Sequence, residues 1–288
     1  MKRPIVTPRL LLSARSLAGV SLATRDRMVD VRARYREPES LAVTLSKALD
    51  AGVDGVLASP MPALRAALAE LRRPVPLYLV LPALSEHERH ELEPGVETVI
   101  GRGGRGIGIG SRLRLGLGGM LRPAVFFRGD LVARAPLMIE AEVAAVGARD
   151  LRGVVLDAWL ADLALAAGHR RFFDAYCRFV RRRFRAAAGF ETHNLGLLLA
   201  RLREWGVRPD FVVGPLNPAG LMMKPSADEL LEELARSDVP VLAKELRGGG
   251  VSTLEQGAGF ARARHAYGLA PDLAELDDVG AELRALAR

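Results

Sequence analysis

Short β-like runs, each followed by a helical pattern, recur along the chain and constrain its fold more than any other feature. Alternation of strands and helices is typical of parallel βαβ units, in which the helices cover the sheet. Several runs are apolar at every position, as strands are when both of their faces are covered. We identify eight such runs, at residues 19–23, 54–59, 75–82, 96–100, 153–158, 188–194, 210–217 and 239–246.

Eight strands in 288 residues predict a (β/α)8 TIM barrel, a single α/β domain that spans residues 1–288. Closure of the sheet cannot be read from a sequence, so a doubly wound open sheet is the alternative fold. The helical patterns also carry end signals. Ser226 and Glu229 form a capping-box pattern, while Gly52 and Gly206 stand where a helix end favours a left-handed residue. The clearest helical patterns are at 38–52, 196–206 and 226–237.

Composition limits the partners that the chain can have. The net charge of +7 and the pI near 10.1 permit an acidic partner. Arginine far outnumbers lysine, which also fits a compositional bias unrelated to function. No secretory signal pattern and no run of eighteen uncharged apolar residues occurs, so we expect a soluble, cytoplasmic protein that does not cross a membrane. The single cysteine, Cys177, is expected to pack as a core thiol.

A Gly/Arg-rich segment at about 101–122 breaks the alternation of strands and helices. Its nine glycines between residues 101 and 119 predict an irregular segment, either a lid over the barrel mouth or an insertion. The run GRGGRG at 101–106 matches a dinucleotide fingerprint, but neither the required helix nor the later acidic residue follows. The run HERHE at 87–91 lacks the spacing of a zinc helix and is interpreted as a solvated face.

Polar residues at strand ends are the candidate catalytic groups, because barrels carry their chemistry at the carboxyl ends of the strands. The two-residue period of 188–194 predicts that Glu191 and His193 point inward and that Asn194 caps the next helix. Lys244 follows a buried run and is a candidate nucleophile, base or anion holder, or a salt-bridge partner of Glu191 or Asp157. Asp157 is a candidate acid or base, or a helix N-cap.

A glycine triplet and its neighbours predict an anion site. Exposed N–H groups before a helix bind anions, and barrels hold phosphate after strands seven and eight, which we take to be 210–217 and 239–246. The candidate substrate- or phosphate-binding residues are Asn194, Asn217, Lys224, Arg247, Gly248, Gly249 and Gly250.

The last hundred or so residues, with GFETHN, FVVGPLNPAG and VPVLAKELRGGG, resemble the C-terminal half of aldo/keto reductase-like barrels. The resemblance implies that Asn217, Lys244 and the loop 248–250 receive the phosphates of a nicotinamide cofactor. The first half departs from the family, since the second and third strands end in LASPMPAL and LVLPAL. These ends supply no Asp, Tyr, Lys or His of the family's catalytic set.

The leading hypothesis is an enzyme of lyase or isomerase type that acts on a small phosphorylated or carboxylated metabolite. Lys244 would be its nucleophile or base, with proton transfer by His193 and Glu191. This hypothesis requires no cofactor and no metal. The first alternative is an NADP-binding, aldo/keto reductase-like oxidoreductase. The second is a noncatalytic barrel that binds RNA or a protein through the basic stretches 102–134 and 177–185, although no nucleic-acid motif occurs.

Overall fold

The computed structural model describes residues 4–83 and 131–288. Eight parallel strands follow one another around the sheet in chain order. Parallel bridges between Leu10 and Leu269 and between Ser13 and Asp272 join the last strand to the first, so the sheet closes. The strands are β1 (Leu11–Ser13), β2 (Gly55–Ala58), β3 (Pro76–Leu81), β4 (Asp150–Leu156), β5 (Ala187–Glu191), β6 (Phe211–Pro215), β7 (Val241–Lys244) and β8 (Gly268–Leu269).

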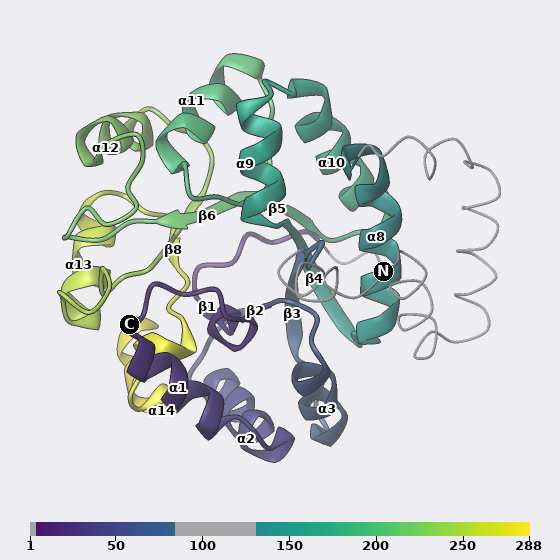
Figure 1. Cartoon of the computed structure of the whole chain (residues 1–288), viewed down its shortest axis with the longest axis vertical. Coiled ribbons are helices and arrows are strands. Elements are labelled where there is room, and N and C mark those ends of the chain that lie inside the picture. The colour runs from purple at the N-terminus through teal and green to yellow at the C-terminus, as the bar shows by residue number, and fades with distance from the viewer. Residues whose placement is uncertain (1–3, 84–130) are drawn as a thin grey trace.

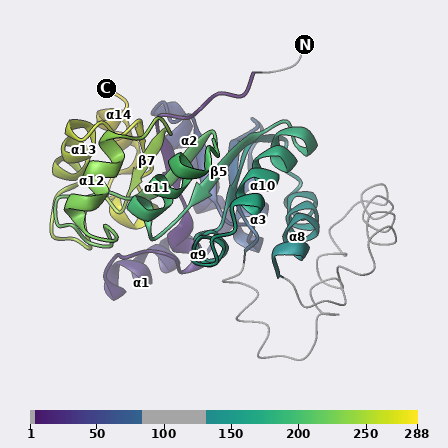
Figure 2. The same ribbon diagram turned by 90° about the horizontal axis from the view of Figure 1, so that it is seen from above.

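Helices surround the strands, as Figures 1 and 2 show from two directions. Among the described residues they are α1 (Arg25–Arg34), α2 (Pro38–Asp50), α3 (Pro62–Glu70), α8 (Leu131–Val146), α9 (Ala158–Ala166), α10 (Arg170–Arg183), α11 (Leu195–Trp205), α12 (Ala227–Ala235), α13 (Leu254–Ala263) and α14 (Val279–Leu286), with short 3-10 helices η1 (Arg15–Ala18) and η2 (Leu273–Glu275). This arrangement confirms the predicted (β/α)8 barrel and excludes the open sheet. No helix in the described part of the chain is long and apolar enough to cross a membrane.

Two of the eight predicted strands have no counterpart among the described strands. Residues 19–23 form a loop, because Gly19 ends η1 with φ of 82° and Thr24 then caps α1. The prediction of a strand there was wrong. The first strand is instead β1, which has three residues and was too short for its pattern to be recognised. The predicted strand 96–100 lies outside the described residues, as do the Gly/Arg-rich segment and the run at 87–91.

The later predicted strands carry lower numbers in the described sheet, because the run 96–100, which lies outside the described residues, was counted as the fourth strand, and the missed two-residue strand β8 comes last. The runs 210–217 and 239–246, which we took to be strands seven and eight, are β6 and β7. The loops predicted to hold an anion therefore follow β6 and β7.

The local end signals are mostly confirmed. Gly52 and Gly206 have φ of 94° and 65°, and the Ser226 hydroxyl accepts a hydrogen bond from the backbone N–H of Glu229. The Glu229 carboxylate, however, accepts from the Ser226 hydroxyl and makes no reciprocal bond to its backbone. Cys177 is buried in the core between barrel and helices, as predicted, and burial raises the pKa of its thiol to about 12.

The inside of the barrel is a separate apolar core below the mouth. Its largest rings, Tyr78 and Phe211, meet edge to face with centroids 5.8 Å apart. Glycines opposite them make the room: a Cβ on Gly153 would lie 2.4 Å from Tyr78, and one on Gly189 would lie 2.7 Å from Phe211. Side chains two residues beyond the inward positions therefore emerge above this core, at the carboxyl ends of the strands.

Candidate active site

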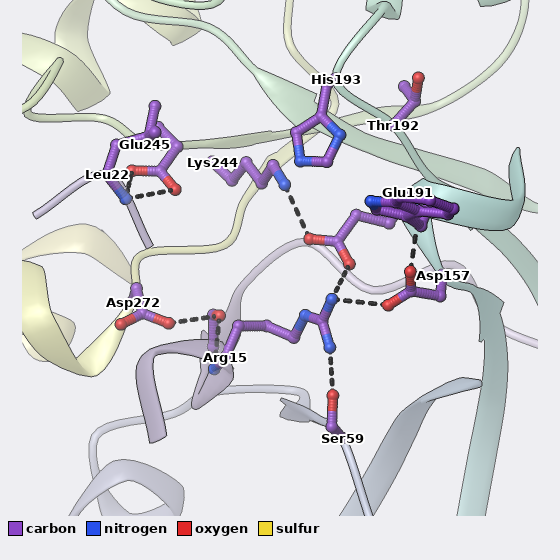
Figure 3. A network of polar contacts seen from close by, with 12 residues as sticks. Arg15, Leu22, Ser59, Asp157, Glu191, Thr192, His193, Lys244, Glu245 and Asp272 are labelled. Carbon is purple, nitrogen blue, oxygen red and sulfur yellow. Dashed lines mark hydrogen bonds and ion pairs between the residues drawn. The ribbon is translucent and has the colours of Figure 1, made fainter. Parts of the chain in front are cut away.

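A cluster of buried charged side chains lies above the apolar barrel core (Figure 3). Each member follows an inward-facing strand residue by two positions or stands at the end of a strand, so the pleat directs it to the barrel axis. The cluster consists of Arg15 after β1, Ser59 after β2, Asp157 after β4, Glu191 on β5, Lys244 on β7 and Asp272 after β8. All six residues are buried.

Arg15 connects two of the three carboxylates of the cluster, those of Asp157 and Glu191. One guanidinium nitrogen lies 2.8 Å from Oδ2 of Asp157 and 3.2 Å from Oε2 of Glu191. The other terminal nitrogen donates to Oγ of Ser59. Arg15 was missed in the sequence because β1 was not recognised. The sequence could have indicated Arg15, because it lies four residues after Leu11 and so continues the inward face of an apolar run.

Lys244 forms the second link of the cluster. Its Nζ donates to Oε1 of Glu191 at 2.7 Å, so the predicted salt bridge with Glu191 is present. Glu191 thus lies between two cations, as Figure 3 shows. Burial alone would raise the pKa of Glu191, but the charges of Arg15 and Lys244 outweigh it and lower the pKa to about 2.

Asp157 has two contacts, one of which confirms the predicted helix N-cap. Its Oδ1 accepts from the backbone N–H of Trp159 at 3.0 Å and caps α9, while Oδ2 meets Arg15. Burial raises the pKa of Asp157 above its usual value despite the charge of Arg15, because Glu191 stands on the same guanidinium. Asp157 and Glu191 pair with the same cation, yet the pKa of Asp157 is raised and that of Glu191 is lowered.

The β5–α11 turn holds the next two candidates. His193 is part-buried, and its Nδ1 lies 3.0 Å from Oδ2 of Asp162, a residue of α9 that sequence reasoning missed. Asn194 occupies the N-cap position of α11, but its side chain makes no capping hydrogen bond. The prediction of a capping side chain was wrong. The backbone N–H of Asn194 donates to Oγ1 of Thr192, and the Thr192 hydroxyl in turn donates to Asp162.

The candidate anion-binding residues are more dispersed than the cluster. Both amide atoms of Asn217 bond to the backbone of Leu221 and hold the loop after β6, and Lys224 is exposed on that loop. Gly248, Gly249 and Gly250 follow β7 with φ of 55°, 74° and 95°. Such positive φ values suit glycine alone at low cost.

A cavity of about 270 Å³ opens beside the glycine triplet. Its lining includes Gly249, Gly250, Arg27, Arg247 and Glu245. Glu245 follows Lys244 with φ of 55°, and its carboxylate accepts from the backbone N–H of Leu22 at 3.3 Å. Burial raises the pKa of Glu245 to about 7. At the inner wall, burial raises the pKa of Glu275 to about 8 although the backbone N–H of Arg247 donates to it.

Within residues 4–83 and 131–288, no three His, Cys, Asp or Glu side chains are placed to hold a metal ion. Within the cluster, Arg15 pairs with Asp157 and Glu191, and Lys244 pairs with Glu191.

Comparison with known proteins gives structural similarity at low identity. No family model and no curated protein sequence matches the chain. An aldo/keto reductase from Brucella melitensis is similar in structure, with a TM-score of 0.47, 13% identity and coverage of 96% of this chain and 84% of that chain. Gox0644 in its apo form has a TM-score of 0.46 and 11% identity, covering 98% and 90%.

A third similar structure is described as QR15, an aldolase, with a TM-score of 0.43, 14% identity and coverage of 86% of this chain and 90% of that chain. At such identities the three structures give no information on the chemistry of this chain, which rests on its own residues.

Proposed function

We propose that this chain is a barrel enzyme that acts on a small carbonyl compound bearing a carboxylate or phosphate, by lyase or isomerase chemistry through Lys244. The observation that carries the proposal is the buried Lys244–Glu191 pair, 2.7 Å apart, within a charged cluster at the carboxyl ends of the strands. A buried ion pair is weak evidence for a stabilising role. Each ion loses several kcal/mol of hydration free energy, and the attraction between the two ions offsets about the same amount. Perturbed charges gathered at a barrel mouth are instead typical of active sites.

The exposure of the cluster favours Lys244 as the group that meets a substrate. The side chains of Glu191 and Arg15 are 1% and 5% exposed, whereas that of Lys244 is 11% exposed. The amine therefore lies at the outer side of the cluster and the carboxylate beneath it. In the proposed complex, a carbonyl carbon would meet the amine and leave the ion pair between Arg15 and Glu191 in place.

The choice of cation supports the same role. Only four of the 41 basic residues are lysine, namely Lys2, Lys47, Lys224 and Lys244. Most basic residues of the chain are arginine, but the residue at the buried end of β7 is a lysine, Lys244. An amine can lose its proton and form an imine, whereas a guanidinium stays charged and does not.

Lys244 would attack the carbonyl carbon, and the carbonyl oxygen would leave as water to give an imine. Glu191 would act as the counter-ion that holds the amine in place, with Arg15 fixing Glu191. The substrate anion would bind toward the glycine triplet, where Arg247, Gly249 and Gly250 line the cavity. Asn194, Asn217 and Lys224 would contribute at most to the shape of the surrounding loops.

Borohydride trapping tests this proposal. The protein is incubated with pyruvate, glyoxylate, dihydroxyacetone phosphate or glyceraldehyde 3-phosphate, reduced, and mapped by peptide mass spectrometry. We expect one stable adduct, on Lys244, with at least one compound. Lys224→Arg serves as the matched control, since it removes a nearby exposed lysine and should keep the adduct, while Lys244→Arg should lose it. No adduct, or equal labelling of Lys47 and Lys224, would refute the imine.

A second candidate function is NADP binding of the aldo/keto reductase type. The observation that favours it is the run of three glycines with positive φ beside Arg247, on the wall of a cavity of about 270 Å³. Titration with NADPH should then raise the melting temperature, because a ligand that binds only the native state stabilises it. An unchanged melting temperature at millimolar NADPH would exclude this candidate.

A further inference from the structure

Asp162 on α9 makes three hydrogen bonds to the turn that carries His193. Its Oδ1 accepts from Oγ1 of Thr192 at 2.5 Å. Its Oδ2 accepts from the backbone N–H of His193 at 3.1 Å and lies 3.0 Å from Nδ1 of the ring. Burial would raise the pKa of Asp162, but the hydrogen bonds from His193 and Thr192 outweigh it and lower the pKa, so this carboxyl stays ionised.

These contacts fix the tautomer of the histidine. An ionised carboxylate can only accept hydrogen bonds, so Nδ1 of His193 must carry the hydrogen. In the neutral ring the lone pair then belongs to Nε2. The side chain of His193 is 35% exposed, and no hydrogen bond to Nε2 is found within the described ranges. Nε2 is therefore an oriented and accessible proton acceptor.

The ring also lies in range of the charged cluster. When protonated, His193 contributes to the lowered pKa of Glu191, the carboxylate that binds Lys244. In Figure 3 the ring of His193 and the amine of Lys244 point into the same space above Glu191. A compound attached to Nζ of Lys244 would extend into that space.

Glu191 is poorly suited to be the proton acceptor there. Its two cations keep it ionised with a pKa near 2, and its Oε1 is bonded to Lys244. A base that removes a proton from carbon works best with a pKa near the working pH. Asp157 bonds Arg15 and the N-terminus of α9 with its two oxygens, which leaves the imidazole as the group to take a proton.

We propose that Asp162 and His193 form a proton-transfer dyad that serves the Lys244 imine, with Asp162 as the positioning residue and Nε2 of His193 as the proton acceptor. This inference rests on the proposed function. The dyad would take a proton from the carbon next to the imine carbon. In the protonated imine, the electron pair of that C–H bond forms the C=C bond of a neutral enamine, the C=N pair moves to the positively charged nitrogen, and the proton stays on Nε2 until it returns to carbon or to another acceptor.

Hydrogen exchange at carbon separates the dyad from the imine. Pyruvate or dihydroxyacetone phosphate, whichever is trapped on Lys244, is incubated with the protein in D2O, and loss of the carbon-bound protons is followed by NMR. His193→Gln should keep the borohydride adduct and lose about 100-fold or more in exchange rate, the usual contribution of a general base. His265→Asn replaces an exposed histidine with positive φ and should change neither readout.

Variants of Asp162 test the positioning role. Asp162→Asn can present its NH2 group to Nδ1 and so move the hydrogen of the ring to Nε2, which removes the lone pair from the acceptor. We expect about a tenfold or larger loss of exchange with the adduct retained, and partial recovery in Asp162→Glu. A merely structural carboxylate would change the melting temperature and leave exchange per trapped amine unchanged.

Each outcome decides between the two proposals. Wild-type exchange in His193→Gln, with the adduct present, would overturn the dyad and leave the imine intact. Loss of both adduct and exchange in His193→Gln and His193→Asn would place His193 in imine formation and overturn its role at carbon. No adduct in the wild type would overturn the imine and the dyad together.

Discussion

Replacing Arg15 with methionine removes the cation that joins the two buried carboxylates of the mouth. In the native protein its guanidinium lies 2.8 Å from Asp157 and 3.2 Å from Glu191, with all three side chains at most 7% exposed. Methionine keeps most of the apolar stem and cannot pair with either acid. Glu191 still has Lys244, so Asp157 becomes the unpaired buried group.

The loss of stability follows from that geometry. Removing one partner of a buried pair costs about 3–5 kcal/mol, because the remaining charge stays out of water. We therefore expect Arg15→Met to lower the free energy of unfolding by about 3–5 kcal/mol near pH 7. Asp157→Asn in the same chain removes the unpaired charge and keeps an oxygen for the N–H of Trp159. The double variant should recover about 1–2 kcal/mol of the loss.

Urea unfolding followed by tryptophan fluorescence measures these values. Trp205 on α11 packs on Phe173 of α10 with ring centroids 5.7 Å apart, so its emission reports the packing of these two helices. Arg201→Met is the matched control, because its pair with Glu204 has side chains 46% and 59% exposed and should be worth less than about 1 kcal/mol. A loss below about 1 kcal/mol in Arg15→Met, or no recovery in the double variant, would refute the reasoning.

Two buried acids and one glycine give further predictions. Burial raises the pKa of Glu275 to about 8 from its ordinary 4.5, so between these pH values the native state holds a proton that the unfolded chain has released. The free energy of unfolding should therefore fall by up to about 5 kcal/mol as the pH rises from about 4.5 to about 8. Urea unfolding at a series of pH values should show a weaker dependence of this free energy on pH in Glu275→Gln. The pKa of Glu191 is lowered to about 2, so its contribution to the free energy of unfolding exists above about pH 4.5 and is lost as the pH falls toward 2. The same loss of stability between pH 4.5 and 2 in Glu191→Gln would contradict this. Gly153→Ala, with its Cβ 2.4 Å from Tyr78, should cost about 1–3 kcal/mol in thermal unfolding, whereas Gly259→Ala in open space on α13 should cost nothing.

Some of the candidate site was legible in the sequence because a strand has a period of two. Gly189 and Glu191 point into the barrel as that period predicts, and so do Leu242 and Lys244. The salt bridge of Lys244 with Glu191 and the N-cap at Asp157 were alternatives that the residue types themselves suggested. These features depend on neighbours along one strand or on the start of the next helix.

Other parts of the site were decided by residues far apart in the chain. Arg15 contacts Asp157 across 142 positions, and Asp162 reaches His193 from a different helix. Asn194 had the residue type of a cap, yet the backbone N–H of Gly196, one of the groups from which an N-cap accepts, donates instead to the carbonyl of Lys224 at 3.0 Å. Such competition among partners is visible only when all of them are placed in space.

The sequence by itself determined the alternation of strands and helices, and with it the barrel class, because buried strands and amphipathic helices are set by residue types a few positions apart. It could not determine the first and last strands, which have three and two residues and owe their form to pairing with neighbours. Only the closed sheet brought the ends of β1, β4, β5 and β7 together. Ion pairs act over a few ångströms in space, so the charged cluster of this protein exists through ring closure and not through any local pattern.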